Sequence, residues 1–172
     1  MNVYGTEQIR NVVLLGHGGA GKTTVAEAMA LITGVTKRMG KVADGNTISD
    51  YDKEEIKRQF SISTTLIPLE YQGENGPVKV NLLDTPGFFE VEEAISVADA
   101  AIIVVNCKAG IEPGTERAWE MCEKYNLPRL IFVTNMDDDH ASYRELVVKL
   151  EKKFGRKIAP FQLPIRENEK FV

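Results

Sequence analysis

A single loop near the start of the chain, Gly16-His17-Gly18-Gly19-Ala20-Gly21-Lys22-Thr23, matches the phosphate-binding pattern G-x-x-x-x-G-K-[ST] at every defined position. A polyphosphate carries several negative charges, so many backbone N–H groups must converge on it. Glycine permits the backbone angles and the close approach that this requires. We expect Lys22 to contact the β- and γ-phosphates and the Thr23 hydroxyl to bind Mg²⁺, with Thr24 also at the site.

The residues on either side of this loop fit the same interpretation. The apolar run Val12–Leu15 predicts a buried strand that enters the loop. Apolar residues follow the loop at helical spacing, namely Val25, Ala28, Met29 and Ile32. This order places the phosphates at a helix N-terminus, and Gly34 is a suitable C-terminal glycine for that helix. The alternative, a glycine-rich turn that ends in Lys-Thr by chance, does not explain the two flanking elements.

The size and charge of the chain limit its classes of function. Its 172 residues are enough for one domain with a core and too few for two of ordinary size. Its net charge of -4 gives no general attraction to nucleic acid, so we expect no sequence-specific DNA partner. The sequence has no apolar run long enough to cross a bilayer and no apparent secretory signal, and Cys107 and Cys122 form no disulfide framework or metal-binding pattern. We therefore expect a cytoplasmic location without a membrane partner.

A hairpin is predicted after a long irregular segment. Residues 34–60 are charged and weakly periodic, which is typical of a functional loop or a disordered segment. Apolar residues alternate with polar ones over residues 62–66, before Pro68, as expected of an edge strand. A turn over residues 72–77 and a second alternating run over residues 78–82 complete the predicted antiparallel hairpin.

The remaining pattern is that of an α/β domain. Residues 100–105 and 130–133 are unbroken apolar runs, as in parallel strands covered on both faces, and we expect them at the centre of a sheet. Helical patterns follow Pro113 and Ser142, and Trp119 in the first of them is expected to serve packing alone. We predict a three-layer α/β P-loop fold with a mostly parallel sheet, one antiparallel edge strand and helices on both faces.

Asp84-Thr85-Pro86-Gly87, at the end of the second hairpin strand, is the second motif. An aspartate at the C-terminal end of a strand beside a phosphate-binding loop is placed to hold Mg²⁺, usually through water. Gly87 can offer its N–H to a γ-phosphate. A simple turn of this composition is common elsewhere, but its place after a strand and downstream of the phosphate-binding loop favours the functional interpretation.

Thr134-Asn135-Met136-Asp137 ends the last apolar run and is the third motif. The Asp137 carboxylate can accept two hydrogen bonds from the N1 and N2 groups of guanine, a pairing that adenine cannot supply. The alternative role of Asp137 is a charge at the N-terminus of the next helix, together with Asp138 and Asp139.

These motifs resemble those of the translational GTPases, in particular elongation factor G and its close relatives, which include the ribosomal-protection proteins. The loop at 16–24, with histidine in its second position, is similar to theirs, and similar stretches follow in the same order. They are residues 92–99, 109–113, 125–128, 133–137 and 159–165. The resemblance implies GTP or GDP and Mg²⁺ as ligands, base contacts from Asn135 and Asp137, and GTP hydrolysis on the ribosome. It also implies that Lys22 is the catalytic residue that stabilises charge on the transferred phosphoryl group, and we expect a monomer.

Several positions depart from the family pattern. Gly19 stands where the family's loop usually has aspartate, which removes a carboxylate near the phosphates. Asn135 replaces the lysine whose stem covers the base, so we expect guanine specificity with lower affinity. Ser61 keeps a hydroxyl for Mg²⁺ in the switch segment, and Phe88 replaces the histidine that orients the attacking water.

The stretch after Gly87 is about four residues shorter than the family pattern. Either the switch is truly shortened, or a loop between Phe89 and Glu90 is missing from the sequence as given, and the second is favoured because switch loops lose order without the γ-phosphate. Phe88 also leaves a second function open, a nucleotide-binding switch or ribosome-interaction module with little hydrolysis. A third is an ATP-binding protein, because Asp137 lacks its usual neighbours.

The resemblance also divides the chain into two parts. Residues 1–157 resemble part of the family's G domain, and residues 158–172, with one short strand candidate ending at Pro164, resemble the start of its inserted subdomain. The last strand and helix of the family's G domain have no counterpart in the sequence. No general base is identifiable, so we expect weak intrinsic hydrolysis.

Overall fold

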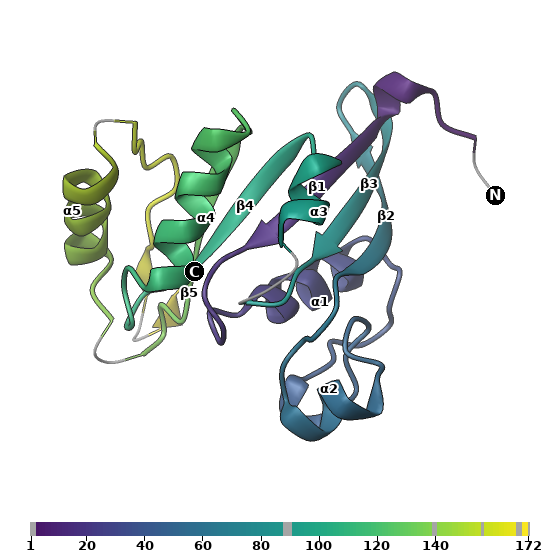
Figure 1. Cartoon of the computed structure of the whole chain (residues 1–172), viewed down its shortest axis with the longest axis horizontal. Coiled ribbons are helices and arrows are strands. Elements are labelled where there is room, and N and C mark those ends of the chain that lie inside the picture. The colour runs from purple at the N-terminus through teal and green to yellow at the C-terminus, as the bar shows by residue number, and fades with distance from the viewer. Residues whose placement is uncertain (1–2, 88–90, 139–140, 156, 168–169, 172) are drawn as a thin grey trace.

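A five-stranded sheet forms the centre of the computed structural model, which describes residues 3–87, 91–138, 141–155, 157–167 and 170–171 (Figure 1). The strand order is β2-β3-β1-β4-β5. The parallel strands are β1 (Ile9–Leu15), β3 (Gly76–Asp84), β4 (Ala100–Asn106) and β5 (Arg129–Thr134). β2 (Thr65–Gly73) pairs with β3 in the antiparallel direction at one edge, which confirms the predicted hairpin and sheet type.

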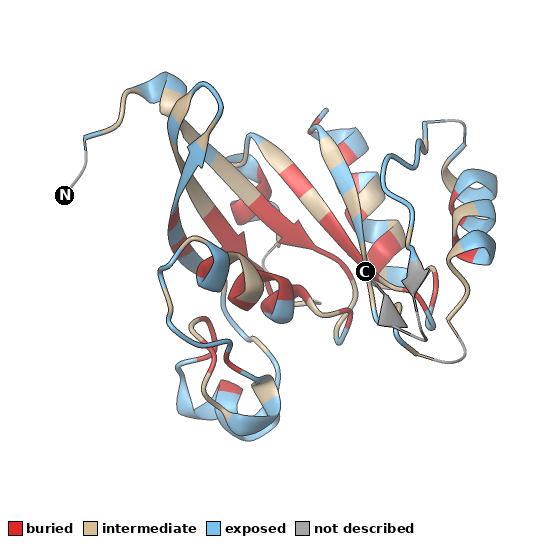
Figure 2. Cartoon of the chain, turned by 180° about the vertical axis from the view of Figure 1, so that it is seen from behind, coloured by how far each residue is buried: buried red, intermediate tan, exposed pale blue. Residues whose placement is uncertain are grey.

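Helices cover both faces of this sheet. One face packs against α1 (Lys22–Ile32), and the other packs against α3 (Val91–Ser96), α4 (Pro113–Lys124) and α5 (Tyr143–Phe154). Strand β1 shows the reason, because Val13 and Leu15 belong to the core under α3, α4 and α5, whereas Leu14 belongs to the core under α1. All three side chains are at most 1% exposed, and burial is concentrated along the inner strands (Figure 2). The predicted three-layer fold is confirmed.

Strand β5 differs from the expectation. It was predicted at the centre of the sheet, but it forms an edge of the sheet in the described residues. Leu130 and Phe132 are accordingly 38% and 44% exposed. An unbroken apolar run does not by itself show that both edges of a strand are paired, and this is why the prediction was wrong.

The predicted register of β2 was also wrong. The strand begins at Thr65 and continues through Pro68. Its inward-facing residues are Ile67 and Leu69, each 1% exposed, whereas Leu66 is 56% exposed. An edge strand tolerates proline, so Pro68 does not end it, and the alternation starts one residue later than the pattern suggested.

The helix after the phosphate-binding loop ends near Gly34, as predicted. Its last residue is Ile32, and Gly34 has a φ of +77°. Its buried apolar face consists of Val25, Ala26 and Ala30, and Ile32 is 80% exposed, contrary to the expected spacing.

The segment between α1 and β2 has a defined structure. It contains a short 3-10 helix, η2 (Val42–Asp44), and the helix α2 (Lys53–Arg58). Polar side chains are buried along it, namely Thr47, Ser49, Asp50 and Glu55. The sequence left two possibilities open for this segment, a functional loop or disorder, and the structure shows an ordered segment.

Residues 157–164 form no strand, contrary to the prediction of a short strand that ends at Pro164. They line a groove of about 1070 Å³ together with β5 and α5, away from the phosphate-binding loop. Two short strands follow as an antiparallel pair, β6 (Arg166–Glu167) and β7 (Lys170–Phe171).

Candidate functional site

The loop from Gly16 to Thr23 joins β1 to α1 in a shape that only glycine adopts readily. Gly16, Gly19 and Gly21 have φ values of +140°, +80° and +97°. A Cβ on Gly16 would lie 2.4 Å from the carbonyl oxygen of Val104, so a side chain there would push the loop away from β4. The loop ends on the N-terminus of α1, where free backbone N–H groups favour an anion.

The other loop residues lie around this turn. Gly18 is half-buried, Gly19 is exposed and Ala20 is 1% exposed. Thr24 is exposed on the first turn of α1. Between Gly16 and Gly21, a ligand would therefore meet mainly the backbone of the loop.

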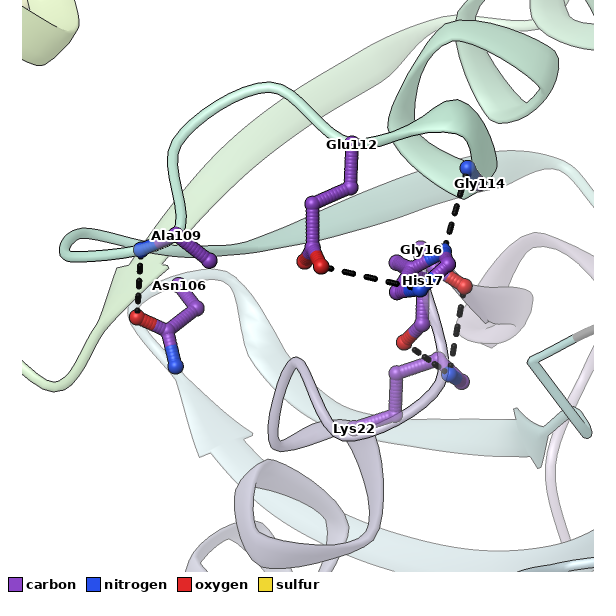
Figure 3. A network of polar contacts seen from close by, with 7 residues as sticks. All are labelled: Gly16, His17, Lys22, Asn106, Ala109, Glu112 and Gly114. Atoms are coloured by element: carbon purple, nitrogen blue, oxygen red, sulfur yellow. Dashed lines mark hydrogen bonds and ion pairs between the residues drawn. The ribbon is translucent and has the colours of Figure 1, made fainter.

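Lys22 is buried beneath the loop. Its Nζ donates to the carbonyl oxygens of Gly16 and His17 at 3.2 and 3.0 Å (Figure 3). Burial lowers the pKa of Lys22, while the charges of Asp84 and Glu112 act in the opposite direction. A desolvated ammonium group that has two neutral oxygens as partners is well suited to a phosphate oxygen.

Oxygen atoms from three segments meet at the start of α1. Thr23 Oγ1 donates to Asp84 Oδ2 at 2.9 Å and lies 3.3 Å from Ser61 Oγ. Ser61 Oγ in turn donates to Asp50 Oδ1 at 2.7 Å. The three residues proposed as Mg²⁺ ligands from the sequence therefore lie together. Asp50 was not identified from the sequence, because it is one of several acidic residues in a stretch without a pattern.

Asp84 is a buried carboxylate that is incompletely paired. It is 1% exposed, and its Oδ1 has no hydrogen-bond partner among the described residues. Burial raises the pKa of Asp84 to about 6, although the nearby Ser49 and Thr23 hydroxyls and the Lys22 ammonium group limit the rise. An open carboxylate oxygen beside two hydroxyls is a donor set that fits Mg²⁺.

The fit depends on oxygen ligands beyond the acidic residues. In the ranges that the structure describes, no group of three or more His, Cys, Asp or Glu side chains could hold a metal ion. Mg²⁺ usually keeps several waters and binds through one or two carboxylates and substrate phosphates, so such a group is not required.

The Asp84–Gly87 segment packs directly on the phosphate-binding loop. A Cβ on Gly87 would lie 2.6 Å from both the N and the Cα of Gly18. Thr85 is 1% exposed, and its Oγ1 donates to the carbonyl oxygen of Leu14 at 2.6 Å. Gly87 is thus close enough to serve a phosphate bound in the loop. Phe88, and the loop expected between Phe89 and Glu90, lie outside the described residues.

His17 joins the phosphate-binding loop to the start of α4. The N–H of Gly114 donates to His17 Nδ1 at 3.3 Å, and His17 Nε2 lies 3.6 Å from Glu112 Oε1 (Figure 3). Because Nδ1 accepts a hydrogen bond, the Nε2 atom carries the proton that faces Glu112. A Cβ on Gly114 would lie 2.5 Å from His17 Cα, so the loop and helix approach each other through this glycine.

The end of β5 is fixed against the same loop. Thr134 Oγ1 donates to the carbonyl oxygen of Ala20 at 2.7 Å. Asn135 follows with a φ of +54°, and both Asn135 and Asp137 are exposed. Asp138 forms an ion pair with Lys108 at 2.9 Å. The anchoring role of Thr134 was missed from the sequence, where the only signal is a hydroxyl at the end of a buried strand.

Comparison with known families settles the membership of the chain. Residues 7–168 match the family model of the elongation factor Tu GTP binding domain. The chain belongs to this family.

Several relatives of the chain are longer translation factors. The chain is 37% identical over 160 residues to an elongation factor G-like protein of Mycobacterium tuberculosis, covering 91% of the chain and 22% of that protein. It is 33% identical over 176 residues to elongation factor G of Granulibacter bethesdensis, covering 100% of the chain and 25% of that protein. It is 35% identical over 170 residues to the mitochondrial ribosome-releasing factor 2 of Anopheles gambiae, covering 96% and 22%. The chain thus spans about a quarter of their length or less.

A solved structure shows the same fold. A crystal structure of a Thermus thermophilus protein superposes with a TM-score of 0.88 at 39% identity, covering 96% of the chain and 25% of that protein. Among the described residues, every helix is too short or too polar to span a membrane.

Proposed function

We propose that this chain binds a guanine nucleotide with Mg²⁺ and hydrolyses GTP as the nucleotide-binding part of a translation factor of the elongation factor G kind. The observation that carries the proposal is the convergence of the buried Lys22, the Thr23 and Ser61 hydroxyls and the open oxygen of Asp84 at one helix N-terminus. Family membership supports guanine as the base and the ribosome as the partner.

Each group has a part in this proposal. The N–H groups of residues 16–21 and of Gly87 hold phosphate oxygens, and Lys22 neutralises charge on the transferred phosphoryl group. Thr23, Ser61 and Asp84 would hold Mg²⁺, which would neutralise charge on the bound phosphates. Asp137 would accept hydrogen bonds from guanine, beside Asn135.

The wider setting is part of the same proposal. We propose that residues 1–157 act as part of a G domain and that residues 158–172 begin a separate subdomain. The chain would act as a monomer in the cytoplasm.

Nucleotide binding and phosphate release test the proposal. We expect the chain to bind fluorescent GTP and GDP in the presence of Mg²⁺, with GTP competing and ATP failing to compete. Substitution of Asp137 by asparagine replaces an acceptor by a donor at the base, so preference should move from guanine towards xanthine nucleotides. Binding of ATP in preference to GTP would contradict the choice of base.

Hydrolysis is tested separately because Phe88 stands where the family has a histidine. We expect slow release of phosphate from GTP by the chain alone and faster release with ribosomes. Binding without any release, with or without ribosomes, would contradict GTP hydrolysis and support a nucleotide-binding switch or ribosome-interaction module.

A further inference from the structure

Glu27 is a buried carboxylate that the proposed nucleotide site does not use. It lies on α1, one helical turn after Thr23, and is 1% exposed. Its Oε2 accepts a hydrogen bond from the N–H of Gly40 at 2.6 Å, and its Oε1 accepts one from the N–H of Ile48. Across the part of the chain that the structure describes, no ion pair involves Glu27. Backbone N–H groups alone therefore compensate its burial.

A buried carboxylate is energetically unfavourable at a core position. Burial of a charge is unfavourable unless hydrogen bonds replace its hydration, and an apolar side chain would avoid that cost. The carboxylate instead fixes the position of residues 40–48, because the N–H groups of Gly40 and Ile48 must both point at this one side chain. Gly40 supports this contact, since a Cβ there would lie 2.7 Å from Asn46 O and 2.8 Å from Glu27 Oε2.

Contacts connect the segment held by Glu27, residues 40–48, to Ser61. Ile48 follows Thr47, whose hydroxyl donates to Asp50 Oδ2 at 3.2 Å. The other carboxylate oxygen of Asp50 accepts from Ser61 Oγ at 2.7 Å, and Ser61 Oγ lies 3.3 Å from Thr23 Oγ1. These contacts run from one turn of α1 out through residues 40–61 and back to the previous turn of the same helix.

We propose that Glu27 is a positioning residue for the Mg²⁺ site: it docks residues 40–48 on α1, so that Asp50 can hold the Ser61 hydroxyl beside Thr23. Glu27 itself contacts neither nucleotide nor metal. The inference rests on the proposed function, because it assigns Glu27 to the placement of a metal ligand in that site. Its structural part, the docking of residues 40–48, can be measured without any nucleotide.

The decisive variant is Glu27→Gln, which keeps the size of the side chain. An amide offers one acceptor oxygen and places a donor against the second N–H, so one of the two attachments must be lost. We expect Mg²⁺ to increase the affinity of wild type for a non-hydrolysable GTP analogue, and we expect this increase to be smaller by about tenfold or more in Glu27→Gln. Affinity for GDP in EDTA should be unchanged.

Limited proteolysis supplies the readout that needs no nucleotide. Lys41 follows Gly40 directly and is exposed, so trypsin can reach it if the segment leaves α1. We expect cleavage after Lys41 to be several-fold faster in Glu27→Gln than in wild type, by mass spectrometry of the fragments. Gly40→Ala attacks the same contact from the other side and should have the same two effects, which covers the case that Glu27→Gln does not fold.

Leu146→Ala is the control for stability. Leu146 lies on α5 and is 2% exposed, far along the sheet from residues 40–61, and its truncation removes core packing alone. An equal loss of the Mg²⁺ effect in this variant would overturn the proposal, as would unchanged cleavage and an unchanged Mg²⁺ effect in Glu27→Gln. If wild type bound no nucleotide, the proposed function would fail, and faster cleavage at Lys41 would still support the docking role of Glu27.

Discussion

Lys22 and Asp84 are charged residues that the fold buries a short distance apart, at the N-terminus of α1. Neither is fully compensated, because Lys22 donates to carbonyl oxygens and one oxygen of Asp84 has no partner in the described residues. Groups of this kind lower the stability of the empty protein and gain partners when an anion and a cation bind together.

The charge of Asp84 should therefore reduce stability at neutral pH. Its pKa is about 6 in the folded chain against an ordinary value of 3.8, so the folded chain holds this proton more tightly and loses stability as the pH rises between these values. We expect Asp84→Asn without ligand to gain up to about 3 kcal/mol in the free energy of unfolding at pH 8, with a gain that shrinks towards pH 4. Urea unfolding at several pH values measures this.

The same variant should fail as a metal ligand. Mg²⁺ should no longer strengthen nucleotide binding in Asp84→Asn, and in wild type this strengthening should decline as the pH falls below about 6, where Asp84 takes up a proton. A variant that is no more stable than wild type at pH 8 would contradict this account of Asp84.

A variant of Lys22 tests the contribution of the buried positive charge. Lys22→Met keeps the length of the side chain and removes its charge. We expect affinity for GTP to fall by about 100-fold or more, because a charged hydrogen bond to phosphate is lost. Stability of the empty protein should stay the same or rise. Lys124→Met, on the exposed end of α4, is the control and should change neither quantity.

At the scale of elements, the loops that follow β1, β3 and β5 form the site and depend on contacts with one another. Thr134 at the end of β5 binds the carbonyl oxygen of Ala20, and Gly87 after β3 touches Gly18. The carboxyl ends of parallel strands lie at one edge of a sheet, so residues from distant parts of the sequence meet there.

Thr134→Val tests this dependence. Valine has nearly the same shape as threonine but cannot donate to Ala20, which leaves a buried carbonyl oxygen without that partner. We expect a loss of about 1 to 2 kcal/mol in the free energy of unfolding and a severalfold weaker affinity for GDP, measured by urea unfolding and fluorescence titration. Unchanged affinity would show that the end of β5 does not support the loop.

The sequence predicted those parts of the fold that repeat a pattern. Strands such as β1 and β4 are buried on both faces, so their apolar runs are unbroken, and the phosphate-binding loop is specified by its own residues. Residues 34–60 could not be predicted, because their order comes from carboxylates that accept from backbone N–H groups at irregular separations along the sequence. Glu55, for example, accepts from the N–H groups of Ile62 and Ser63, and no periodicity marks such a contact. Asp50 was missed in the site for the same reason.

At the scale of the whole molecule, two separate cores on either side of the sheet hold the site between them. A ligand that binds only the folded chain should stabilise it as a unit. With GDP and Mg²⁺ at about 100 times the dissociation constant, we expect a gain of about 2.7 kcal/mol and a rise of about 5 to 10 °C in the melting temperature. Scanning calorimetry with GDP, and with ADP as the control, measures this, and an equal rise with ADP would contradict the choice of guanine.

The buried carboxylates of Glu27 and Glu55 hold the segment of residues 40–63 through backbone N–H groups, which every residue except proline provides. Side chains at the attached positions can therefore change while the attachment stays, apart from Gly40, where the space is closed. This segment can diverge widely among related proteins without loss of its docking. Low similarity across it is then weak evidence that a relative has lost its switch, whereas replacement of the two glutamates or of Gly40 would be strong evidence.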